Sequence, residues 1–264
     1  YYWQGKIPGT PFFSSIPFGM TSYEQDAWLR YGGGNELWRE LYEPFNLIPV
    51  RGGNSGVQMF GWFNKEINSL EDLQGLTMRI PSLGGEVFRR AGGVPVTMQV
   101  SEVFTALQTG ALDATEFVSP YNDLAAGYHT VAEYYYYPGW HEPGSTLETI
   151  FNKEKFESLP KDLQEILMAG TEIMNQLLLD ELMAKNNEAL KVLVEDHGVQ
   201  LRKLPNDVLT ELHRISEDVV SEMSSVDEQT AKVYESWKNF RDNVINYNRI
   251  AEEAFIEARN LPLN

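Results

Sequence analysis

The sequence contains no cysteine and few basic residues. The missing cysteine excludes thiolate catalysis, disulfide bonds and thiolate metal sites, and it suits an oxidising compartment. Lysine and arginine number 21 against 38 aspartates and glutamates, so the formal net charge is −17. This charge is spread along the chain and disfavours binding to nucleic acid or to anionic membranes. A small anionic ligand remains compatible, because an arginine inside a cleft acts on it more strongly than distant surface charges do.

Long apolar runs and the common enzyme motifs are also missing. No run approaches the length that spans a bilayer. The sequence has no G-x-G-x-x-G, P-loop, H-E-x-x-H or G-x-S-x-G. The glycine-rich stretches at 32–34 and 52–56 lack a following Lys-Ser/Thr pair, so we predict turns there. The four histidines show no spacing typical of metal ligands: His129, His141, His197 and His213.

What is present indicates an α/β protein. The chain has 264 residues, 42% of them hydrophobic, enough for one large domain or two moderate lobes. Short apolar runs at 76–80 and 94–98 predict strands. Residues 101–110, between a serine cap and a glycine stop, predict a helix, and residues 111–114 predict a further strand. The order strand, helix, strand favours an α/β fold.

Beyond residue 159 the pattern changes to long helices. Apolar residues recur every three or four positions from Leu163 to Leu178, and again from Val208 to Met223. The last segment alternates steps of four and three: Val233, Trp237, Phe240, Val244, Tyr247, Ala251 and Ala254. Such a seam either docks a terminal helix on its own domain or forms a dimer contact, and the first interpretation is the more common.

Three polar residues stand where predicted strands end, and a fourth, Gln58, lies in a glycine-rich stretch. Arg79 interrupts an apolar strand just before a predicted helix, a position where an arginine can bind a carboxylate through two parallel hydrogen bonds. An ordinary salt-bridged arginine is the alternative. Glu116 and Glu142 could act as an acid and base pair, could ligate a cation through oxygen, or could be unrelated surface groups. Gln58 could donate to a ligand.

Taken together, several motifs resemble the solute-binding proteins of TRAP (tripartite ATP-independent periplasmic) transporters, the DctP-like family. The closest branch is similar to the one that binds 2-oxo acids or lactate with a metal ion. The motifs lie in order over more than half the chain, at residues 2–6, 17–20, 53–59, 73–80, 106–116 and 137–144.

The resemblance implies a role for each polar residue. Arg79 matches the arginine that pairs with the ligand carboxylate, while Gln58, Glu116 and Glu142 match positions that hold a cation and ligand oxygens. Phe117 stands where related sequences have tryptophan; a backbone carbonyl would keep the metal site, whereas an indole contact would be lost. Oxygen ligation suits Na⁺ or Ca²⁺ better than zinc. By position we also expect three aromatic residues to wall the pocket: Phe12, Tyr121 and Trp140.

The family fold is a two-lobed α/β clamp with mixed sheets and long C-terminal helices, which closes by a hinge motion. The resemblance places residues 1–27 and 115–150 in lobe I, and residues 28–114 and 151–225 in lobe II. Residues 226–264 would form a C-terminal helix that can be exchanged in a dimer. The sequence starts at Tyr1 without an initiator methionine or signal peptide, and the resemblance begins partway through lobe I, so we expect a processed or shortened form.

We therefore predict a periplasmic solute-binding protein, not an enzyme, which captures a small 2-oxo or 2-hydroxy monocarboxylate and delivers it to TRAP membrane subunits. One alternative keeps the family and changes the ligand to another organic anion or a compatible solute. The alternative of another class is a glycoside hydrolase that uses Glu116 and Glu142 as its carboxylate pair.

Overall fold

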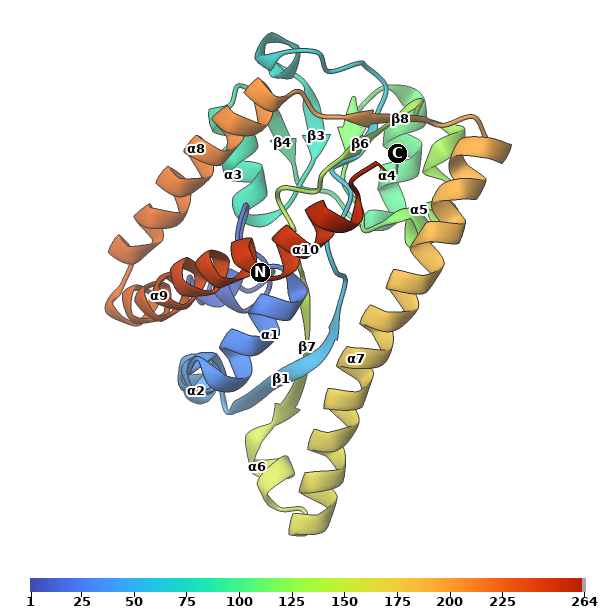
Figure 1. Ribbon diagram of the computed structural model, residues 1–264. Helices are drawn as coiled ribbons and strands as arrows, with labels where there is room; N and C mark the ends of the chain where they lie inside the picture. The colour runs from blue at the N-terminus through green and yellow to red at the C-terminus, as the bar shows by residue number, and fades with distance from the viewer. Residues whose placement is uncertain (263–264) are drawn as a thin grey trace.

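A six-stranded mixed sheet forms the upper part of the computed structural model, which describes residues 1–262 (Figure 1). In spatial order its strands are β4 (Val94–Val96), β3 (Thr77–Arg79), β5 (Ala114–Thr115), β2 (Gly61–Phe63), β6 (Tyr134–Tyr137) and β8 (Gln200–Lys203). β3 runs parallel to β4 and β5, and β6 runs parallel to β8, whereas β2 is antiparallel to both of its neighbours. The predicted strands around Arg79 and residue 95 are confirmed.

Helices cover both faces of this sheet (Figure 1). They are α3 (Ser82–Arg90), α4 (Val100–Thr109), α5 (Pro120–Ala126) and α8 (Asn206–Glu222). Side chains of a strand alternate between faces. Phe63 on β2 therefore joins a hydrophobic cluster with α3 and α8, while its neighbour Trp62 joins a second cluster with α4. The sheet is thus buried on both sides, as in an α/β fold.

A long two-stranded ribbon descends from the sheet and pairs β1 (Leu47–Asn54) with β7 (Thr146–Asn152) in antiparallel register (Figure 1). The surrounding helices are α1 (Ser22–Tyr31), α2 (Gly34–Tyr42), α6 (Lys153–Glu157) and α7 (Lys161–Lys191). α7 has 31 residues and packs along β1. At a rise of about 1.5 Å per residue it is roughly 46 Å long, and it extends along most of the molecule.

The predicted turn at residues 52–56 is partly wrong, because Gly52 and Gly53 lie inside β1. A Cβ atom at Gly52 would lie 2.2 Å from Oγ1 of Thr149 on β7, and one at Gly53 would lie 2.6 Å from a methyl carbon of Leu178 on α7. The glycines permit this close approach of helix and ribbon. Their role here is in packing.

The strands do not follow the expected lobe boundaries. β6, from the segment assigned to lobe I, lies between β2 and β8, which come from segments assigned to lobe II. The ribbon likewise pairs one segment of each lobe. The division into lobes therefore remains a prediction, and the shared sheet argues for different boundaries.

The C-terminal region consists of α9 (Glu228–Ile250) and α10 (Glu252–Arg259), which meet where Ala251 leaves helical geometry. The apolar seam from Val233 to Ala254 is buried in its first part and exposed in its later part. Val233 and Trp237 are buried in the core, whereas Tyr247 is 64% exposed. Six short helical turns complete the described elements: η1 (Thr10–Phe13), η2 (Glu43–Phe45), η3 (Leu70–Leu73), η4 (Tyr128–Thr130), the π-helical η5 (Val192–Asp196) and η6 (Met223–Ser225). Within residues 1–262, no helix has both the length and the apolar character to cross a membrane.

Candidate ligand and cation site

A cavity of about 370 Å³ lies where the end of the large sheet meets the ribbon and α7. Residues from β3, α2, β7 and α7 contribute to its wall, as do the loops after β1 and β5. Its polar lining consists mainly of Ser55, Gln58, Arg79, Asn122, Glu142, Ser145 and Glu148. Its aromatic lining includes Phe13, Trp38, Tyr42 and Phe117. A mostly apolar cavity with a few convergent polar groups is typical of a small-molecule site.

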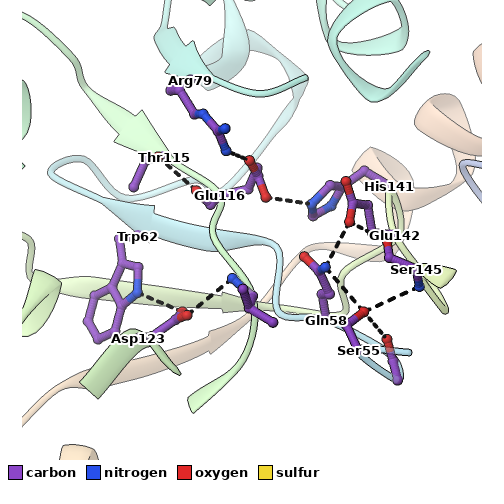
Figure 2. A network of polar contacts seen from close by, with 12 residues as sticks. Ser55, Gln58, Trp62, Arg79, Thr115, Glu116, Asp123, His141, Glu142 and Ser145 are labelled. Atoms are coloured by element: carbon purple, nitrogen blue, oxygen red, sulfur yellow. Dashed lines mark hydrogen bonds and ion pairs between the residues drawn. The ribbon is translucent and has the colours of Figure 1, made fainter. Parts of the chain in front are cut away.

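Arg79 and Glu116 meet because their strands are parallel neighbours. Arg79 ends β3, Glu116 follows β5, and the backbone N–H of Glu116 donates to the Arg79 carbonyl oxygen at 3.1 Å. Their side chains form an ion pair, in which Nη1 of Arg79 donates to Oε1 of Glu116 (Figure 2). Arg79 is 7% exposed and Glu116 only 2%. The arginine therefore carries its charge at the carboxyl end of the sheet, facing the cavity.

Glu116, His141 and Glu142 form a compact buried cluster. One potential ligand atom of each lies within 4.8 Å of the others, and Nε2 of His141 is 3.8 Å from Oε2 of Glu116. Glu142 accepts hydrogen bonds from Ser145 Oγ and from Gln58 Nε2, the latter at 2.7 Å (Figure 2). Two buried carboxyl groups thus lie close together, and Arg79 forms an ion pair with one of them, Glu116.

Burial sets the protonation of the cluster. It raises the pKa of the Glu116 carboxyl to about 7, although Arg79 acts in the opposite direction. Burial also raises the pKa of Glu142, and the negative charge of Glu116 raises it further. The pKa of the His141 imidazole falls to about 4, chiefly because of burial. At neutral pH the histidine is therefore neutral, and burial makes each carboxylate costly unless a cation or a proton compensates its charge.

Unsatisfied atoms surround this cluster. Within the described part of the chain, Oε1 of Gln58 and both ring nitrogens of His141 are buried and have no hydrogen-bond partner. A buried polar atom without a partner is costly, so a ligand at this point would be favoured. The carboxylate and amide oxygens fit a hard cation such as Na⁺ or Ca²⁺. The donor set therefore accommodates the cation that the resemblance implied.

The structure brings some predicted site residues together and leaves others apart. Gln58, Arg79, Phe117 and Glu142 line the cavity, and Glu116 lies directly behind Arg79. The three proposed aromatic wall residues lie outside its lining. Trp140 packs in the core with ring centroids 5.6 Å from Phe18 and 5.5 Å from Phe60. Tyr121 is 38% exposed on α5, beneath the ammonium group of Lys185.

Phe12 is fully buried against Trp237, with ring centroids 5.4 Å apart, and it does not reach the cavity. Its neighbour Phe13 does, because consecutive side chains of the turn η1 point in different directions. Phe13 stacks on Trp38 at 5.3 Å with the rings 6° from parallel. The expected aromatic wall is thus not made by Phe12, Tyr121 or Trp140, and Phe13 is among the residues that line the cavity instead.

Sequence reasoning missed His141, which was set aside for lack of metal-ligand spacing. The spacing rule fails here because Glu116, which follows β5, is 25 positions away from His141, while Glu142 is its direct neighbour. Direct adjacency to Glu142 was the available signal. It also missed Trp38, Tyr42 and Glu148, which reach the cavity from α2 and β7. No local motif marks these three.

Comparison with known proteins identifies the family. The family model DctP, described as bacterial extracellular solute-binding protein, family 7, matches residues 1–227. The chain belongs to this family. The prediction of an extracytoplasmic, TRAP-type solute-binding protein is thereby confirmed, and the family is one of transport proteins and not of enzymes.

Three relatives of this solute-binding protein are informative. It is 41% identical over 255 residues to a monocarboxylate 2-oxoacid-binding periplasmic protein from Nostoc sp., covering 97% of this chain and 70% of the relative. A TRAP periplasmic solute-binding protein from Colwellia psychrerythraea, solved with calcium and pyruvate, superposes with a TM-score of 0.94 at 39% identity, over 98% of this chain and 79% of the other. One from Pseudoalteromonas atlantica, solved with sodium and pyruvate, gives 0.92 at 40% identity, over 97% and 78%.

Proposed function

We propose that the protein captures a small 2-oxo monocarboxylate together with Na⁺ or Ca²⁺ and delivers it to the membrane subunits of a TRAP transporter. The observation that carries this proposal is the juxtaposition of Arg79 with two buried carboxyl groups and the unpartnered Oε1 of Gln58. Pyruvate with calcium or sodium in two relatives supports the same ligand chemistry.

Each residue has a distinct role in this proposal. Arg79 binds the ligand carboxylate through its planar guanidinium group. Glu116, Glu142, Gln58 and the backbone carbonyl of Phe117 hold the cation. The bound cation neutralises the carboxylates and supplies a positive charge for the ligand's carboxylate and keto oxygens. Ser145 and Ser55 keep Glu142 and Gln58 in position by hydrogen bonds.

A glycoside hydrolase would use the buried carboxyl pair as acid and nucleophile or base. The ligand atoms of Glu116 and Glu142 lie within 4.8 Å of each other, which is closer than the about 6.5–9.5 Å of inverting enzymes and near the about 5–5.5 Å of retaining ones. The spacing therefore argues against an inverting mechanism alone. Binding is favoured over hydrolysis by the family, which is one of solute-binding proteins.

Calorimetric titration of dialysed protein with pyruvate tests the proposal, in Na⁺, in Ca²⁺ and with chelator. We expect cation-dependent binding and a rise in melting temperature, because a ligand that binds only the folded state stabilises it. Arg79→Ala should abolish both effects. The matched control is Arg89→Ala, since Arg89 lies on the exposed surface of α3. Absence of pyruvate binding under every condition, or turnover of a glycoside, would contradict the proposal.

We also propose a homodimer in which the C-terminal helices of one subunit pack on α7 of the other. α7 carries an exposed apolar stripe with Ile166, Ile173 and Leu177 at 63%, 58% and 56% exposure. Gly170 lies in the middle of this stripe, where no neighbour lies within 4 Å of a Cβ atom. A second apolar surface on α9 and α10 has Ile250 at 78% and Phe255 at 63% exposure. Two unpartnered surfaces on one chain can satisfy each other in a twofold dimer.

Sedimentation equilibrium tests the dimer. The unmodified chain should sediment as a dimer at tens of micromolar, and Gly170→Arg should sediment as a monomer, because arginine would fill the space left by the glycine. Gly170→Arg should preserve the folded subunit, since arginine is a good helix former. The control is Lys191→Gln, which also changes the net charge by one unit and lies at the end of α7. A monomeric unmodified chain would overturn the dimer.

A further inference from the structure

His141 lies in the buried cluster with Glu116 and Glu142, yet it is not among the groups that hold the cation in the proposed function. Its side chain is almost fully buried, and among residues 1–262 neither ring nitrogen has a hydrogen-bond partner. A neutral imidazole has one N–H donor and one acceptor, and leaving both unpaired in the interior is costly. We therefore expect the ring to gain a partner when the site is occupied.

Packing fixes the position of the imidazole ring. The Phe60 ring meets it edge to face with centroids 5.8 Å apart and an interplanar angle of 64°, and the Trp140 ring does so at 5.7 Å and 71°. Helix α3 also approaches closely, since a Cβ atom at Gly84 would lie 3.0 Å from the Cβ atom of His141. The imidazole has little room to move, so a partner must come to the ring.

Glu116 offers an acceptor to this ring. Nε2 of His141 is 3.8 Å from Oε2 of Glu116 (Figure 2), and a shift of less than about 1 Å would bring the two atoms to hydrogen-bond distance. The other carboxylate oxygen, Oε1, already accepts from Nη1 of Arg79. An ionised carboxylate only accepts hydrogen bonds, so the nitrogen that faces it is the one that carries the proton. A protonated ring nitrogen has no lone pair left for a metal ion.

We propose that His141 is a positioning residue: in the cation-loaded protein its Nε2–H donates to Oε2 of Glu116 and fixes this carboxylate beside the cation, without ligating the cation itself. A carboxylate has about four acceptor sites, so Glu116 can accept from Arg79 and His141 and still bind the ion. Oxygen ligands suit Na⁺ and Ca²⁺, and a nitrogen ligand is not required. Groups that orient a ligating carboxylate typically change metal affinity by about 10–100-fold. This inference rests on the proposed function of the cleft.

Calorimetric titration with Ca²⁺, in sodium-free buffer with saturating pyruvate, tests the role of the N–H group. His141→Phe keeps a ring in the same packing and removes both nitrogens. We expect its Ca²⁺ affinity to fall at least about tenfold. The melting temperature of the cation-free variant should stay the same or rise, because two unpartnered polar atoms leave the interior.

Two further variants serve as references. His141→Gln retains an N–H donor at a similar distance from the backbone, and it should bind Ca²⁺ within about threefold of the unmodified protein. The control is His129→Phe, because Nδ1 of His129 is also buried without a partner in the described part of the chain, and His129 lines a separate cavity beside His197. This control should leave Ca²⁺ affinity unchanged.

Nitrogen-15 NMR of the histidine side chains separates positioning from direct ligation. The His141 signals are assigned by their loss in His141→Gln. With Ca²⁺ and pyruvate bound, we expect Nε2 to carry the proton and its shift to change relative to the cation-free protein, because the N–H gains the Glu116 carboxylate as acceptor. An Nε2 without a proton in the loaded protein, or signals identical with and without the cation, would contradict the positioning role.

The affinities distinguish this inference from the proposed function. If the unmodified protein binds Ca²⁺ and pyruvate and His141→Phe binds Ca²⁺ equally well, the positioning role is overturned and the proposed function stands. A fall in affinity together with a drop of several degrees in the melting temperature of both His141 variants would also overturn it, because the histidine would then support the fold. If pyruvate binds in no cation, the proposed function itself fails.

Discussion

Asp123 forms one buried acidic site, and Glu116 with Glu142 forms another. The two sites differ in how many hydrogen bonds the chain supplies to them (Figure 2). Asp123, 1% exposed, accepts three hydrogen bonds: from Trp62 Nε1 at 2.9 Å, from the Tyr135 hydroxyl at 2.7 Å and from the Val118 backbone N–H at 3.2 Å. Glu116 and Glu142 are as deeply buried, yet they share one arginine and lie beside the unpartnered oxygen of Gln58.

Protonation alone does not distinguish these two regions. Burial raises the pKa of Asp123 to about 7 and that of Glu116 to about 7 as well. The difference lies in the direct partners: Asp123 accepts three hydrogen bonds from the chain, whereas Gln58 Oε1 and the His141 ring nitrogens, on the residues that contact Glu142 and Glu116, have no partner among residues 1–262. An acid with a raised pKa that accepts its hydrogen bonds from the chain serves the fold. An acid with a raised pKa beside unpaired polar atoms is a candidate for ligand binding. Substitutions at the two sites should therefore separate stability from binding.

The largest effect should come from Glu142→Gln. The amide can still accept from Gln58 and Ser145, but it loses the charge that holds the cation. We expect affinity for pyruvate in Ca²⁺ to fall at least about 100-fold, roughly 3 kcal/mol. The melting temperature without ligand should stay the same or rise, because a buried like-charged neighbour of Glu116 is removed. Calorimetry and thermal unfolding of the same sample measure both.

A loss of binding accompanied by a drop of several degrees in the ligand-free melting temperature would contradict this prediction. It would mean that Glu142 supports the fold in the way that Asp123 does. The comparison between the two acidic groups would then not hold.

The sequence predicted the centre of the site better than its periphery. Arg79 and Glu116 each end a strand, so their meeting follows from the parallel pairing of β3 and β5. Gln58 and Glu142 were placed by resemblance, and the structure brings them to the same cluster. Their binding roles remain predictions. Arg79 and Glu116 could be found from the sequence because a polar side chain at the end of an apolar strand is a local pattern.

The remaining features depend on three-dimensional arrangement. Phe12 and Phe13 have the same local sequence environment, and only the direction of the turn η1 decides which one reaches the cavity. Glu148 meets Tyr42 because β7 pairs with β1 in one register, and a shift of one residue would turn Glu148 to the other face. The division into lobes remains a prediction for a related reason, since β6 pairs with β2 and β8, which are far apart in the chain.

A second effect, smaller than the first, is a pH dependence of stability that belongs to Asp123. Its pKa is about 7 in the folded protein and 3.8 as a model value. The folded protein therefore holds a proton that the unfolded chain has lost between these pH values. The resulting stability is fully present below about pH 4 and is lost as the pH rises through 7.

We expect the free energy of unfolding of the cation-free protein to decrease, through Asp123, by about 1 kcal/mol per pH unit between pH 5 and 7. Urea titrations of the unmodified chain and of Asp123→Asn, at several pH values, give this contribution as a difference, because the charge of Glu116 is the smallest of the influences on the Asp123 pKa. An equal pH slope in the two proteins would show that Asp123 has an ordinary pKa.

The smallest effects should come from removing a single donor at each site. Tyr135→Phe removes one of the three donors to Asp123, and Ser145→Ala removes one of the donors to Glu142. Each deletion should cost about 1–2 kcal/mol, the usual magnitude for a hydrogen bond to a buried acid. At Asp123 this cost should appear as a loss of stability with pyruvate affinity unchanged. At Glu142 it should appear mainly as about tenfold weaker pyruvate binding, because the carboxylate is less well oriented towards the cation. If Ser145→Ala lowers stability as much as Tyr135→Phe does and leaves affinity intact, the bonds around Glu142 serve the fold and not the ligand.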